Sequence, residues 1–120
     1  MTRLLRAAPE MPVVDIDAAL DHYQTRLGFS VAMRMPAGDY AIVERDGVAI
    51  HLFEDPSSRH TPVSVHVFAH GLDALFTELQ GRGAGITQAI VRQAWGNRDF
   101  RISDPSGNEI KFTEPSAEVD

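Results

Sequence analysis

The residues best suited to hold a ligand are aromatic and basic side chains spread over several strand-like segments. Trp95 is the only tryptophan of the chain, and Gly96 directly after it lets another group approach closely. Flat aromatic rings bind planar or cationic ligands by stacking and by attraction of positive charge to the ring face. We therefore expect a ligand site built from the aromatic residues and nearby polar side chains, namely Tyr40, His51, Phe53, His66, Trp95, Arg98 and Lys111.

Some of these residues have a second interpretation that does not involve a ligand. Tyr40 and Phe53 lie in strand-like runs and could be ordinary packing residues. Arg98 could instead pair with Asp104 or Glu109 and brace a hairpin. The sequence leaves both interpretations open.

The two histidines of the predicted site also raise the alternative of a metal centre. His51 and His66 are both within strand-like runs, and Glu10 or Glu109 could supply a third, carboxylate ligand. Their spacing matches no established ligand motif, so we expect polar or partly buried histidines and predict no metal and no cofactor.

Covalent catalysis and phosphate binding have little support in the sequence. The chain contains no cysteine and no Gly-x-Ser-x-Gly motif, which removes the usual thiol and serine nucleophiles. The closely spaced glycines Gly81, Gly83 and Gly85 follow a predicted helix, whereas a phosphate-binding loop would open one. We therefore predict no catalytic residue.

Length and composition indicate one globular domain. The 120 residues are 43% hydrophobic and 23% charged, with no apolar run long enough to cross a bilayer. The net charge of −6 disfavours nucleic acid or an anionic membrane as the main partner. The absence of cysteine and of a charged-then-apolar leader makes the cytoplasm the expected location.

Two amphipathic helices and a set of short strands must position these residues. Asp15 can cap a helix whose apolar residues Ile16, Ala19, Leu20 and Tyr23 recur at helical spacing. Leu72, Leu75, Phe76 and Leu79 repeat that spacing in a second helix. The strand-like segments are 7–14, 29–35, 39–44, 48–53, 63–68, 86–92 and a final hairpin. The prolines in 7–14 predict an edge strand.

The order of these elements is the same in both halves of the chain. Each half reads as one strand, one helix and three strands, which is a βαβββ module. We expect one domain over residues 1–120, with module 1 at about 7–53, a linker at 54–62, module 2 at about 63–114 and an acidic tail at 115–120. The predicted fold class is α+β: a curved, mixed and antiparallel-rich sheet with the helices outside.

The final hairpin, Trp95 to Thr113, carries the most specific pattern. Its alternating strands flank Asp104-Pro105-Ser106-Gly107-Asn108, whose residue types are typical of a tight turn. Together with the preceding Trp-Gly-x-Arg-x-Phe, this string resembles the C-terminal signature of the vicinal-oxygen-chelate superfamily, which includes glyoxalases, bleomycin resistance proteins and dioxygenases. The lead-in to the turn is most similar to the bleomycin resistance branch.

The resemblance also implies where a catalytic metal would be held. Enzymes of the superfamily bind a divalent metal through His, Gln or Glu side chains on particular strands. The matching positions here are Ala8, Ser64 and Lys111. Alanine has no ligand atom, serine is a poor ligand, and an ammonium group repels a cation.

The loss of these ligands favours a binding protein over an enzyme. Bleomycin resistance proteins, which this sequence resembles, sequester a bulky, cationic, metal-chelating glycopeptide without chemistry, in clefts between two chains that exchange modules. We therefore expect a non-catalytic small-molecule binder that forms a module-exchanged homodimer. The alternatives are a metal-dependent glyoxalase-like lyase or an antibiotic-modifying transferase with a relocated His/Glu site, and a dimeric scaffold without a ligand.

Overall fold

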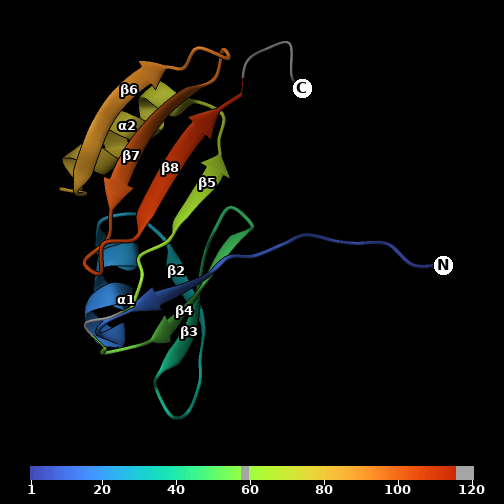
Figure 1. Ribbon diagram of the computed structural model, residues 1–120, viewed down its shortest axis with the longest axis vertical. Coiled ribbons are helices and arrows are strands. Elements are labelled where there is room, and N and C mark those ends of the chain that lie inside the picture. The colour runs from blue at the N-terminus through green and yellow to red at the C-terminus, as the bar shows by residue number, and fades with distance from the viewer. Residues whose placement is uncertain (58–59, 116–120) are drawn as a thin grey trace.

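The computed structural model describes residues 1–57 and 60–115 as two four-stranded sheets, each with one helix (Figure 1). Residues 58–59 of the expected linker and 116–120 of the expected tail lie outside the described part of the chain. The first unit contains β1 (Glu10–Val13), α1 (Ile16–Thr25), β2 (Ser30–Arg34), β3 (Tyr40–Arg45) and β4 (Val48–Glu54). The second contains β5 (Ser64–Phe68), α2 (Leu72–Gly81), β6 (Ile86–Arg92), β7 (Arg98–Ser103) and β8 (Glu109–Glu114).

The strand order is the same in both sheets. It is β1-β4-β3-β2 in the first and β5-β8-β7-β6 in the second, so β1 and β5 are edge strands. The pairs β1–β4 and β5–β8 are parallel and the other pairs are antiparallel. The predicted α+β fold of two βαβββ modules with a mixed sheet is confirmed, and so is the edge position of the first strand. In the described residues no helix is long and apolar enough to cross a membrane.

The two helices begin in different ways. The Asp15 side chain accepts hydrogen bonds from the backbone of Asp17 and Ala18 at the start of α1, as an N-cap does. The residue before α2 is Gly71, in a left-handed conformation, which has no side chain to cap with. The Glu114 carboxylate accepts from the Leu72 N–H instead, at 3.3 Å, so β8 supplies the cap from another element.

Period-two alternation gives each sheet a helix-covered face and an open face. In the second sheet, Phe100 contacts Phe76 of α2 edge-on and stacks on Phe112, with both ring centroids 5.2 Å away. These residues and the aliphatic side chains of the same faces form the core. The residues between them, such as Asp99 and Lys111, therefore lie on the open face.

The turn at 104–108 joins the two modules, and we call it the junction turn. The Asp104 carboxylate is buried and accepts from the Tyr23 hydroxyl at 2.9 Å and from the Asn108 side-chain amide at 3.0 Å. The fully buried Asn108 amide also donates to the Pro12 carbonyl at 2.6 Å. A turn of the second module thus binds both α1 and β1 of the first.

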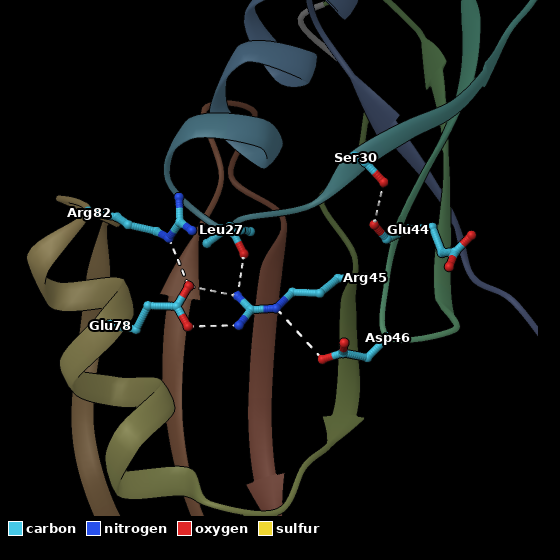
Figure 2. Close-up of polar contacts among 7 residues, drawn as sticks. All are labelled: Leu27, Ser30, Glu44, Arg45, Asp46, Glu78 and Arg82. Atoms are coloured by element: carbon cyan, nitrogen blue, oxygen red, sulfur yellow. Dashed lines mark hydrogen bonds and ion pairs between the residues drawn. The ribbon is translucent and has the colours of Figure 1, made fainter.

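Charged side chains join the modules a second time (Figure 2). Arg45 of β3 donates to both carboxylate oxygens of Glu78 on α2, at 3.0 and 2.7 Å, and to the Leu27 carbonyl at 2.8 Å. Arg82 donates to the same carboxylate at 2.8 Å. The hydrogen bond from Arg45 lowers the pKa of Glu78. This forked geometry fixes the orientation of α2 against the β3–β4 end of the first module.

The buried Tyr23 hydroxyl should make the stability of the protein depend on pH in the alkaline range. Burial and the neighbouring Asp104 carboxylate raise the pKa of Tyr23 well above the ordinary value of 10.0. The folded state favours the neutral phenol. The contribution of Tyr23 to the free energy of unfolding is therefore complete below pH 10.0, and it is lost as the pH rises through the pKa that Tyr23 has in the folded state. Urea midpoints measured from pH 8 upwards should therefore fall in the alkaline range, and the fall should be smaller in Tyr23→Phe. Equal pH dependence in both proteins would contradict this assignment.

Candidate ligand-binding surfaces

The open face of the first sheet carries three of the predicted site residues. Tyr40 on β3 pairs with Phe53 on β4, and His51 lies on the same face of β4. Glu10 of β1 is paired with His51 in the parallel register, which places a carboxylate beside the imidazole. The structure thus brings Tyr40, His51 and Phe53 together, and adds Glu10.

A hydrogen-bonded chain orients the polar groups of this face. The Tyr40 hydroxyl donates to the Glu10 carboxylate at 2.7 Å and lies 2.7 Å from His51 Nδ1. The bond to Glu10 raises the pKa of Tyr40. Because the single phenol proton goes to the carboxylate, His51 Nδ1 must carry the proton it donates to the phenol oxygen. In this tautomer His51 Nε2 is an acceptor for a ligand.

The open face of the second sheet carries two more predicted residues in neighbouring strands. His66 on β5 pairs with Lys111 on β8, and Lys111 pairs with Arg101 on β7. Thr113 donates to the Lys111 carbonyl at 3.2 Å, so its hydroxyl accepts from His66 Nδ1–H at 2.9 Å. The ring of His66 is held in the same tautomer as that of His51, again with Nε2 directed to other partners.

Large apolar side chains are exposed on the strands of this sheet and in the turn between β6 and β7. Trp95, in the turn between β6 and β7, is 66% exposed, and Phe68 at the end of β5 is 61% exposed. Phe68 stacks on His66 with ring centroids 6.0 Å apart. Val91 is also exposed. Sequence reasoning missed Phe68, although period two places it on the face of His66, and it considered Glu10 only as a metal ligand.

The Arg98 side chain forms ion pairs that the sequence did not predict. Its guanidinium donates to Glu114 at 2.7 Å and to Asp73 of α2 at 2.9 Å. The expectation that it would pair with Asp104 or Glu109 is wrong, because Arg98 shares the alternation of Phe100 and therefore lies on the helix side. It ties α2 to the end of the hairpin.

The positions implied by the family for a metal do not fit one. Ala8 precedes β1, Ser64 begins β5, and the Lys111 ammonium lies 3.7 Å from the Glu109 carboxylate on β8. Within residues 1–57 and 60–115, no group of three or more His, Asp or Glu side chains could hold a metal ion. His51 and His66 lie on different sheets, so a single chain does not assemble the relocated metal site considered from the sequence.

Two cavities lie between the two modules. One, of about 520 Å³, is lined by both modules and by the Arg45–Glu78 pair, with Phe68, Val67, Leu75 and Phe112 among its apolar walls. The other, of about 530 Å³, lies between the segment before β1, the start of β4, and β5, and includes His66 and Ala8. Of the predicted site residues, His66 lines the second of these two cavities.

The chain belongs to the glyoxalase/bleomycin resistance protein/dioxygenase superfamily, whose family model matches residues 3–112. A bleomycin resistance protein of Geobacillus stearothermophilus is 27% identical over 128 aligned positions, covering 91% of this chain and 96% of the relative. The resemblance inferred from the Trp95–Thr113 string, including its bleomycin resistance branch, is thereby confirmed.

Solved structures share the fold. A bleomycin resistance determinant encoded on the transposon Tn5 superposes with a TM-score of 0.82 at 22% identity, covering 92% of this chain and 98% of that one. A bleomycin-binding protein complexed with bleomycin gives a TM-score of 0.80 at 20% identity, covering 94% and 100%. At these identities the likeness establishes the architecture of the two modules.

Proposed function

We propose that this protein binds a bulky aromatic or cationic small molecule, such as bleomycin, in the cytoplasm and releases it chemically unchanged. The observation that carries the proposal is the pair of open sheet faces with aromatic and oriented polar side chains, in a chain whose metal-ligand positions hold Ala8, Ser64 and Lys111. The similarity to bleomycin resistance proteins supports this ligand class.

The proposed site is completed by a second chain. The first face offers a carboxylate and two aromatic rings, which suit a cationic and planar ligand. The second offers Trp95, Phe68, His66 and Lys111. Since these two faces belong to different sheets, we propose a module-exchanged homodimer in which the first face of one chain lies opposite the second face of its partner. Nucleic acid and membranes are not part of the proposed function.

Titration of Trp95 fluorescence with metal-free bleomycin, repeated with its metal complex, tests the proposal. Saturable quenching in the micromolar range or tighter, at about one ligand per chain, is the expected result. Mass spectrometry of the recovered ligand should show an unchanged mass. A flat titration, confirmed by calorimetry, would reject bleomycin as the ligand, and a changed mass would reject the non-catalytic assignment.

A further inference from the structure

A buried carboxylate lies on the open face of the second sheet, where solvent-facing side chains are expected. Asp99 of β7 is 1% exposed, and it is paired in register with Thr113, the residue that orients His66. Burying a carboxylate costs several kcal/mol unless charge or hydrogen bonds compensate. Packing alone would favour an uncharged side chain at this position, so the buried carboxylate must be stabilised by the groups around it.

Three donors surround this carboxylate, from β6, from the turn after it and from β7. Gln88 of β6 donates its amide to Oδ1 at 2.9 Å, and Gln93 of the turn donates its amide to Oδ2 at 2.9 Å. The Arg101 guanidinium of β7 lies at 3.5 Å from Oδ1. The register of β6 shifts between Gln88 and Val91, and such a bulge re-aims side chains. Two amides, one from the bent strand and one from the turn after it, therefore converge on one carboxylate.

Gln93 begins the turn that carries Trp95. Its backbone N–H donates to the Asn97 carbonyl at 2.7 Å, and its carbonyl accepts from the Gly96 N–H at 3.0 Å. Arg92 also donates to the Gly96 carbonyl, at 2.8 Å. The tight turn at 93–97 is thus closed on itself, and two side chains tie it to the sheet: Arg92 of β6 through the Gly96 carbonyl, and Gln93 through Asp99.

From these contacts we infer that Asp99 is a positioning residue for Trp95. The buried carboxylate holds Gln93, and Gln93 holds the turn that presents the indole at the edge of the open face. Because the indole is 66% exposed, its orientation depends on how the turn is held, and Gln93 supplies one of the turn's side-chain links to the sheet. For ligand binding the inference rests on the proposed function: a preset indole lowers the entropy lost when a planar ligand stacks on it.

The test uses the full chain without ligand and reads Trp95 directly, since it is the only tryptophan. Gln93→Leu removes the amide on the turn, and Gln88→Leu is the matched control that removes the other amide from the same carboxylate. Asp99→Leu, which removes both acceptor oxygens, is the second variant. We expect fluorescence anisotropy of Trp95 to fall in Gln93→Leu and Asp99→Leu but not in Gln88→Leu. Acrylamide quenching should rise in the same two variants by at most about 1.5-fold, because the indole is already 66% exposed.

Three outcomes would overturn the inference: wild-type quenching and anisotropy in Gln93→Leu, wild-type values in Asp99→Leu, or equal changes in Gln93→Leu and Gln88→Leu at matched urea midpoints. Bleomycin titrations form a separate arm. If the wild type binds, Gln93→Leu should bind about tenfold more weakly than Gln88→Leu, and equal affinities would overturn the role in binding. If the wild type does not bind, the proposed function fails, while the ligand-free data still decide whether Asp99 positions Trp95.

Discussion

Replacing Asp104 with asparagine should lower the free energy of unfolding by about 3 kcal/mol, because a buried charged acceptor is lost. One carboxylate oxygen accepts from Tyr23 and the Asn108 amide, and the other accepts from the backbone N–H groups of Ser106 and Asn108. An asparagine has a single acceptor oxygen. Whichever way it is placed, its NH₂ group faces two donors and leaves them unsatisfied.

Urea denaturation followed by far-ultraviolet circular dichroism measures this loss. Asp46→Asn is the matched control, because Asp46 is exposed and asparagine tolerates its positive φ of 52°. The control should change stability by less than about 0.5 kcal/mol. If Asp104→Asn were as stable as the control, the junction turn would not hold the modules together.

Replacing Trp95 with alanine should weaken bleomycin binding at least tenfold, or about 1.4 kcal/mol, if the proposed function is correct. The indole is the largest exposed ring of the second module and can cover a planar ligand group. Isothermal titration calorimetry must replace fluorescence here, since the variant has no tryptophan. Trp95→Phe should recover part of the affinity because it keeps an aromatic surface.

Gln80→Ala provides the control for this experiment. Gln80 is an exposed residue of α2, on the helix-covered side of the second sheet and away from both open faces. It should bind bleomycin as the wild type does. Comparable losses in Gln80→Ala and Trp95→Ala would place the ligand elsewhere or show that both variants act through stability.

Local patterns in the sequence predicted most of the fold, because the interactions that set them are local. The Asp15 cap and the alternation around the final hairpin both act within a few residues. The start of α2 is different. Gly71 offers no side-chain cap, and the acceptor Glu114 lies 42 residues further along the chain, so no local signal identifies it.

The site was predictable only in part for a similar reason. Alternation correctly places His51 on the same face as Phe53. The same period also predicts that Arg98 lies with Phe100 on the helix side. The burial of Asp99 was not predictable. It depends on a bulge in β6, after which Gln88 and Gln93 both donate to one carboxylate. A register shift of this kind cannot be recognised from the alternation of apolar and polar residues in the sequence.

The junction turn also has a consequence for the order in which the newly made chain acquires its structure. Its partners in the first module, the Pro12 carbonyl and the Tyr23 hydroxyl, are 96 and 81 residues away from Asn108 and Asp104 respectively. At roughly 5–20 residues per second, a ribosome takes several seconds to add that length. During that interval the first module has no partner for these groups except water. The first module can therefore complete these hydrogen bonds only after the last hairpin has been translated. A chain that stops before Asp104 should remain sensitive to proteases.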